Sequence, residues 1–102
     1  MPAKKIQQLA VIGDPISHSL SPAMQTAAIQ RLKAPFRYRA IRVKPEGLKD
    51  FMRGKAKGLA GFNITIPHKE AAATLVDRLA FEAQLIGAVN TVLNKNGELI
   101  GF

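Results

Sequence analysis

The sequence predicts a single α/β domain: a mostly parallel sheet flanked by helices in a three-layer sandwich, with one terminal hairpin. Three observations predict this class. Short apolar and β-branched segments alternate with segments of helical period, as in strand-helix-strand units. Gly, Pro and Asn-Gly steps separate these segments. The chain has 102 residues, 47% apolar and 22% charged, which suits one domain, over residues 1–102, with a substantial core.

The first half of the chain predicts strand, helix, strand and short helix. Residues 9–12 form the continuous apolar run of a strand covered on both faces. Ser21 stands before a proline and is a good N-cap for a helix over 22–33. Residues 36–43 are β-branched, aromatic and basic, which favours an edge strand, and a short helix is expected over 45–53. The apolar stripe of the first helix is expected to consist of Met24, Ala27, Ala28 and Leu32.

The middle of the chain predicts a strand over 61–66 that leads into a helix over 69–76. Pro67 ends the strand and suits the first helical position. A lysine in the first turn, Lys69, opposes the helix dipole, which favours the neutral amine and marks a candidate site. Period two is expected to place three apolar side chains on one buried face: Phe62, Ile64 and Ile66.

The last third predicts a helix and a hairpin. Asp77 is expected to cap a helix over 78–86, which Gly87 ends as a left-handed cap. The Asn-Gly step at 96–97 indicates a tight turn. The two strands of the hairpin are expected over 88–93 and 98–102.

Composition excludes several classes of protein. The chain has no cysteine, so neither a disulfide framework nor a thiolate metal site is expected, and the reducing cytoplasm is the simplest compartment. No apolar run is long enough for a signal peptide or a membrane span. No His, Asp or Glu spacing indicates a metal site, and no G-x-G-x-x-G or P-loop pattern indicates a nucleotide.

The net charge of +8 comes from residues 31–57, which hold ten cationic side chains and only Glu46 and Asp50 as acids. One interpretation is a solvated face plus an edge strand protected by charge. The other is a footprint for the phosphate backbone of a nucleic acid, but interleaved aromatics and known motifs are missing.

Polar side chains gather where the predicted strands lead into loops, the level at which α/β sheets bind ligands. Hydroxyls, amides and one amine suit a small polyhydroxylated acid. A purely structural interpretation, with serine caps, a tight turn and a solvated lysine, stays open. The candidates form three groups: Ser19 and Ser21; Asn63, Thr65 and Lys69; Asn90 and Thr91.

Three blocks of sequence, 13–22, 63–70 and 87–91, resemble the signatures of the N-terminal, substrate-binding domain of the shikimate dehydrogenase family. They read Gly-Asp-Pro-Ile-Ser-His-Ser-Leu-Ser-Pro, Asn-Ile-Thr-Ile-Pro-His-Lys-Glu and Gly-Ala-Val-Asn-Thr. That family reduces 3-dehydroshikimate to shikimate with NADPH. Because the three blocks occur in order and span nearly the whole chain, the resemblance implies the fold and the substrate of that domain.

The resemblance also implies roles for single residues. Ser19 and Ser21 match the serines that hold the substrate carboxylate. Lys69 matches the catalytic lysine, which acts with an aspartate at the reacting oxygen. Tyr38 and His18 receive no chemical role, and Tyr38 is as compatible with the core. Asn63, Thr65 and Asn90 match the residues that hydrogen-bond the ring hydroxyls of the substrate, and Thr91 lies beside them.

The match has two departures. Gln25-Thr26 replaces the family's common His-Asn, which bears on helix packing. The family continues after Phe102 with Asn-Thr-Asp, whose aspartate partners the lysine. The resemblance therefore implies a truncated substrate domain of an NADP-dependent enzyme, without the dinucleotide-binding domain of that enzyme. This substrate domain is expected to bind shikimate weakly and not to oxidise it. C-terminal helices pack on this domain in the family, so self-association, for example as a homodimer, is expected.

Two rival functions remain at this level. A free-standing binder of a hydroxylated carboxylate shares every contact residue with the enzyme. A basic nucleic-acid module predicts binding that weakens steeply with salt and does not depend on Ser19, Ser21 or Lys69. The sequence does not distinguish quinate from shikimate, or NADP from NAD.

Overall fold

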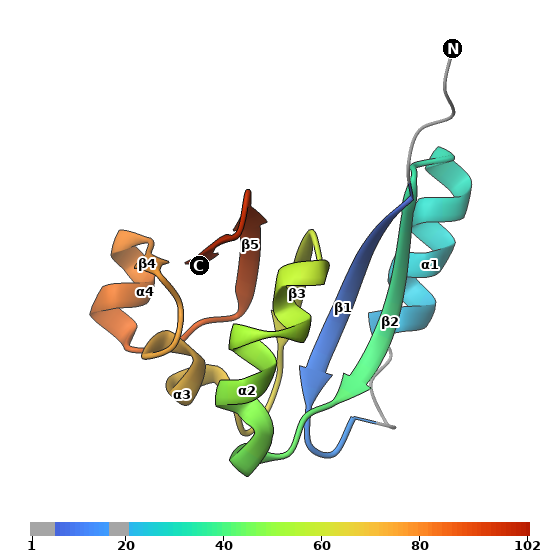
Figure 1. The fold of residues 1–102 in the computed structure, drawn as a ribbon. Helices are drawn as coiled ribbons and strands as arrows, with labels where there is room; N and C mark the ends of the chain where they lie inside the picture. Colours follow the sequence, from blue (N-terminus) through green and yellow to red (C-terminus); the bar gives the residue numbers. More distant parts are fainter. Residues whose placement is uncertain (1–5, 17–20) are drawn as a thin grey trace.

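The computed structural model describes residues 6–16 and 21–102, apart from the side chain of Ser21. Figure 1 shows the fold. Within this part the strands are β1 (Gln7–Gly13), β2 (Phe36–Arg42), β3 (Gly61–Ile64), β4 (Arg78–Leu79), β5 (Thr91–Lys95) and β6 (Glu98–Gly101). The helices are α1 (Ser21–Leu32), α2 (Leu48–Arg53), α3 (Lys69–Ala73) and α4 (Phe81–Ile86), with 3-10 turns η1 (Pro45–Gly47) and η2 (Lys55–Gly58). These elements confirm the predicted α/β class.

The strands form one mixed sheet in the order β2-β1-β3-β5-β6-β4. The pairs β1/β2, β1/β3 and β4/β6 are parallel, whereas β3/β5 and β5/β6 are antiparallel. The edge position predicted for the basic strand is confirmed for β2, and its Arg37 and Arg39 are exposed. Because β5 runs against β3, the start of β5 meets the end of β3 at one edge of the sheet.

Helices cover both faces of the sheet. The larger core lies between one face and the side of α2, α3 and α4, where Ile12, Phe62 and Val92 are almost inaccessible and pack with Leu48 and Met52 of α2. On the opposite face α1 lies along β1 and β2 (Figure 1). Side chains alternate between these faces along each strand, so β1 sends Ala10 and Ile12 to the larger core and Val11 to the α1 face.

The predicted apolar stripe of α1 is wrong. Met24 and Leu32 are 69% and 76% exposed, and Ala27 and Ala28 are also exposed. The half-buried side of the helix carries Thr26 and Ile29 instead. α1 packs on β1 and β2 with this one side, so the rest of its surface, including the predicted stripe, stays exposed.

The segment after β3 also differs from expectation. β3 ends at Ile64, so period two no longer holds and Ile66 is 67% exposed. His68, not Pro67, precedes the helix as its N-cap residue, and α3 ends at Ala73 rather than near 76. The dipole field at Lys69 is therefore that of a five-residue helix, smaller than the sequence suggested.

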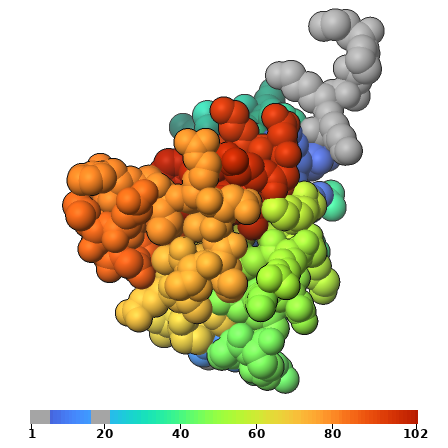
Figure 2. Space-filling model, turned by 60° about the vertical axis from the view of Figure 1, so that its left-hand side comes forward, coloured from blue at the N-terminus to red at the C-terminus, as the bar shows by residue number. Residues whose placement is uncertain are grey.

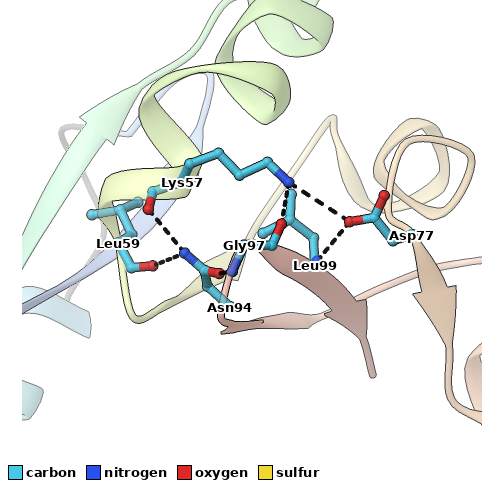
Figure 3. Close-up of polar contacts among 6 residues, drawn as sticks. All are labelled: Lys57, Leu59, Asp77, Asn94, Gly97 and Leu99. Atoms are coloured by element: carbon cyan, nitrogen blue, oxygen red, sulfur yellow. Dashed lines mark hydrogen bonds and ion pairs between the residues drawn. The ribbon is translucent and has the colours of Figure 1, made fainter.

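Asp77 does not cap a helix, which corrects the prediction for residues 78–86. Its carboxylate accepts a hydrogen bond from the Leu99 backbone N–H at 2.7 Å and pairs with the Lys57 amine at 3.7 Å (Figure 3). Residues 78–79 form β4 beside β6, and α4 begins at Phe81. The carboxylate thus joins β6 to the η2 turn instead of closing a helix end.

The predicted hairpin is confirmed. Asn96 and Gly97 have φ of 54° and 92° between β5 and β6, as a tight hairpin turn requires. Asn94 holds the turn: its Oδ1 accepts from the Gly97 N–H, and its Nδ2 donates to the carbonyls of Lys57 and Leu59 (Figure 3). Gly87 ends α4 with φ of 76°, as predicted.

The end of the molecule that carries α4 is apolar. In Figure 2 this helix forms the orange protrusion on one side. Its Phe81, Leu85 and Ile86 are 69%, 72% and 76% exposed.

Among the described residues, no helix has the length and apolar character needed to cross a membrane.

Candidate functional site

The three blocks of sequence meet at one edge of the sheet. The first and second blocks are joined by a backbone hydrogen bond from Asp14 N–H to the Ile66 carbonyl at 3.1 Å, and beside it Thr65 N–H donates at 2.9 Å to the carbonyl of Ile12, the residue just before the first block. β1 ends at Gly13, so these bonds lie at its carboxyl end. The loop after β1 and the loop after β3 are therefore held side by side.

The third block joins the second in the same way. Ile64 N–H donates to the Asn90 carbonyl at 2.8 Å, and Val89 N–H donates to the Lys69 carbonyl at 2.9 Å. Asn90 N–H in turn donates to the carbonyl of Phe102. The backbone thus brings the second and third groups of candidate residues, far apart in sequence, to one edge.

Two of the candidate side chains touch directly. Asn63 and Thr91 are paired across β3 and β5, and Asn63 Nδ2 donates to Thr91 Oγ1 at 3.1 Å. The hydroxyl of Tyr38 donates to Asn63 Oδ1 at 2.7 Å. Because β1 lies between β2 and β3, the Tyr38 side chain reaches across a strand to make this bond. Tyr38 was not among the predicted site residues.

The Tyr38–Asn63–Thr91 triad lies on the α1 face of the sheet. It lines a groove of about 480 Å³ whose other walls are mainly apolar. Leu93 and Phe102 contribute to these walls and are 46% and 50% exposed. Tyr38 is only 8% exposed, and burial raises the pKa of its phenol above the ordinary value of 10.0, so the hydroxyl stays a donor at neutral pH.

The remaining described candidates, Thr65, Lys69 and Asn90, are not among the residues that line this groove. Thr65 and Lys69 are half-buried and Asn90 is exposed. Lys69 opens α3 directly after His68, which is 1% exposed and whose Nε2 donates to the Val43 carbonyl. Since Val43 N–H donates to the Gly13 carbonyl at 3.0 Å, His68 ties the start of α3 to the ends of β2 and β1.

Gly13 permits the close approach of the first and second blocks. A Cβ built on Gly13 would lie 2.3 Å from Thr65 Cγ2 and 3.0 Å from the Ile66 carbonyl oxygen. Real Cβ atoms essentially never come so near another atom. The contact therefore requires glycine, and it sets the position of the Thr65 side chain.

Other predicted residues fall outside what the structure describes. Ser19 and His18 lie in the segment 17–20, and Ser21 begins α1 with an undescribed side chain. The predicted roles of Ser19 and Ser21 stay predictions. Among residues 6–16 and 21–102, no group of three His, Asp or Glu side chains is placed to bind a metal ion.

The fold and the groups at this edge together define a class: an α/β substrate-binding domain with hydroxyl, amide and amine groups where β1 and β3 end and β5 begins. Residues 11–92 match the family described as the shikimate dehydrogenase substrate binding domain. The chain belongs to this family. The resemblance found from its three sequence blocks is confirmed.

Known relatives give the same result. The chain is 48% identical over 95 residues to the NADP-dependent shikimate dehydrogenase of Geobacter sulfurreducens, covering 92% of this chain and 33% of that protein. It is 43% identical to the Thermus thermophilus shikimate 5-dehydrogenase crystallised with shikimate, with a TM-score of 0.90 over 94% of this chain and 37% of that one. The ligand-free 5-ketofructose reductase of Gluconobacter sp. strain CHM43 is 35% identical, with a TM-score of 0.89 over 97% and 36%. The chain spans about a third of the length of these relatives.

Proposed function

We propose that this domain binds shikimate or 3-dehydroshikimate at the carboxyl edge of its sheet, as the substrate-binding part of an NADP-dependent shikimate dehydrogenase. The observation that supports this most is the convergence of the three blocks through three backbone hydrogen bonds, Asp14 to Ile66, Ile64 to Asn90 and Val89 to Lys69. The contact residues would be Ser19, Ser21, Asn63, Thr65, Lys69, Asn90 and Thr91.

The chemistry of these groups suits a hydroxylated acid. Asn63, Thr65 and Thr91 provide neutral donors and acceptors that match ring hydroxyls. Lys69 provides an amine that would hold or transfer the proton at the reacting oxygen of the ligand. Ser19 and Ser21 would receive the carboxylate near the start of α1.

The hydride would come from NADPH. The sequence has no G-x-G-x-x-G turn, so no residue here is assigned to the cofactor. The proposed contribution of this chain is therefore to bind and orient the substrate and to manage one proton. A cytoplasmic location accords with the cysteine-free composition.

Another hydroxylated ketone is the second candidate ligand. The similarity to a 5-ketofructose reductase, with 35% identity and a TM-score of 0.89, favours it. A sugar-derived ketone without a carboxylate would engage the same amide and hydroxyl groups but would not need the two serines. Competition between shikimate and 5-ketofructose therefore separates the two candidates.

Titration of shikimate into isotope-labelled protein, followed by amide and lysine NMR, tests the proposed function. Signals of Asn63, Thr65, Lys69 and Asn90 should move at millimolar ligand. Lys69→Met should weaken binding, whereas Lys95→Met, which removes an exposed lysine at the far end of β5, should not. Movement confined to residues far from this edge would refute the proposal.

Salt dependence tests the nucleic-acid alternative. Binding of an oligonucleotide through the basic residues 31–57 would weaken steeply between low and physiological salt. It would be unchanged by Lys69→Met. The proposed function predicts a site-dependent affinity for shikimate and none of comparable strength for the oligonucleotide.

A further inference from the structure

Two hydrogen bonds within the Tyr38–Asn63–Thr91 triad engage both ends of the Asn63 carboxamide. A carboxamide has one acceptor oxygen and a nitrogen with two donor protons, and a half-turn exchanges them. In this structure Asn63 Oδ1 faces the Tyr38 hydroxyl at 2.7 Å, and Nδ2 faces Thr91 Oγ1 at 3.1 Å. The Asn63 oxygen is therefore already engaged on the side of β2.

We propose that Tyr38 is a positioning residue that fixes the Asn63 carboxamide so that Asn63 and Thr91 both face the ligand as hydrogen-bond donors. Of the two Nδ2 protons, one goes to Thr91 and the second is directed to the open side of the row. Thr91 Oγ1 accepts from Asn63, which leaves its own proton for an acceptor. The row thus selects an oxygen acceptor, such as a carbonyl or a hydroxyl oxygen.

The burial of the three residues supports the positioning role of Tyr38. Tyr38 is 8% exposed, Asn63 is half-buried and Thr91 is exposed. The hydrogen bond from Tyr38 to Asn63, which fixes the orientation of the carboxamide, is thus the one best protected from water. Breaking it would leave a buried polar group without a partner. The Thr91 hydroxyl, which can rotate, lies at the exposed end of the triad, where a ligand would bind.

Geometry favours Tyr38 as an anchor of fixed length. Neighbouring strands lie about 4.8 Å apart, so β2 and β3 are separated by roughly twice that distance. The rigid phenol spans β1 and delivers one hydroxyl to Asn63. A phenylalanine in place of Tyr38 would fill the same space but leave the Asn63 carboxamide free to turn.

NMR of the ligand-free protein tests the positioning role. Nuclear Overhauser contacts should join the Asn63 Nδ2 protons to the Thr91 methyl group rather than to the Tyr38 ring. Tyr38→Phe should make the side-chain amide of Asn63 mobile in its heteronuclear Overhauser effect. Thr74→Val removes a hydroxyl that donates to the Ala71 carbonyl at 2.7 Å elsewhere, and should leave Asn63 unchanged. An equally rigid Asn63 in Tyr38→Phe, or contacts to the ring instead, would overturn the inference.

Ligand binding tests the donor polarity, and this part rests on the proposed function. Tyr38→Phe should weaken shikimate binding about two- to tenfold, the loss of one oriented hydrogen bond. Asn63→Asp keeps the size but has only acceptors, so binding should fall below detection. Asn96→Asp adds the same charge in the exposed hairpin turn and should bind as the wild type does.

The two proposals fail in different ways. A wild-type protein that shows no shifts with shikimate refutes the proposed ligand, while the Overhauser contacts of the free protein still decide the role of Tyr38. Shikimate binding that is unchanged by Asn63→Asp refutes the donor polarity, whatever the other variants show.

Discussion

The contact between Gly13 and Thr65 gives a sharp test of how the site edge is assembled. In Gly13→Ala the new methyl would start 2.3 Å from Thr65 Cγ2. Ordinary van der Waals contact begins at 3.4 Å, so the two carbons must separate by about 1.1 Å. Gly13 lies at a buried strand end with the Ile66 carbonyl on another side, which restricts the movement.

We expect Gly13→Ala to lower the free energy of unfolding by about 1–3 kcal/mol, the usual cost of an overpacked interior. With a urea m-value of about 1.5 kcal/mol/M, the midpoint falls by roughly 0.7–2 M. Gly47→Ala is the matched control, since nothing lies within 4 Å of a Cβ there. Its midpoint should stay close to that of the wild type.

Thr65→Ser removes the clashing methyl and keeps the hydroxyl, so it should rescue Gly13→Ala. Alone, it should cost about 0.5–1 kcal/mol for the lost methyl group. In the double variant the two losses should not add, and the coupling should be at least about 1 kcal/mol. Equal stability of Gly13→Ala and Gly47→Ala, or additive losses in the double variant, would refute the reasoning.

The remaining predictions concern stability, ionisation and association. His68→Leu should lower the free energy of unfolding by about 1–3 kcal/mol because the buried Val43 carbonyl loses its donor. His68→Gln keeps a donor and should cost less. Urea unfolding checks this, since hydrophobicity alone would make His68→Leu the more stable of the two variants. The pKa of Tyr38 is raised by burial, so its ionisation should leave stability unchanged below pH 10.0 and lower it above, where the unfolded chain loses its proton first. The chain has one tyrosine, so tyrosinate absorbance reports this pKa directly, and a pKa of 10.0 or less would contradict the burial argument. Leu93 and Phe102 border the groove half-exposed, so we expect reversible self-association that Leu93→Lys reduces; a monomer at all concentrations in ultracentrifugation would exclude it.

Local patterns predicted most elements correctly. The Asn-Gly turn, the left-handed Gly87 and the alternation of strands and helices all follow from preferences of a few neighbouring residues. β4 was missed because a strand of two residues has no period to detect. The α1 stripe was misjudged because a helix that meets the sheet on one narrow side can leave apolar residues exposed.

The candidate site shows the same division. Its residue types and their grouping into three blocks follow from the sequence. Tyr38 did not, because its bond to Asn63 joins residues 25 apart and depends on which strands are neighbours. The same holds for Asp77, whose partner Leu99 is 22 residues away.

The sequence alone thus determined the class of fold, the three blocks and the family to which they point, because these depend on local chemistry. Only the tertiary structure decided that β5 runs against β3, that Tyr38 reaches Asn63 across β1, and that Gly13 must make room for Thr65. Each of these depends on strand pairing between distant segments, which the burial of the whole sheet selects and no short stretch of residues encodes.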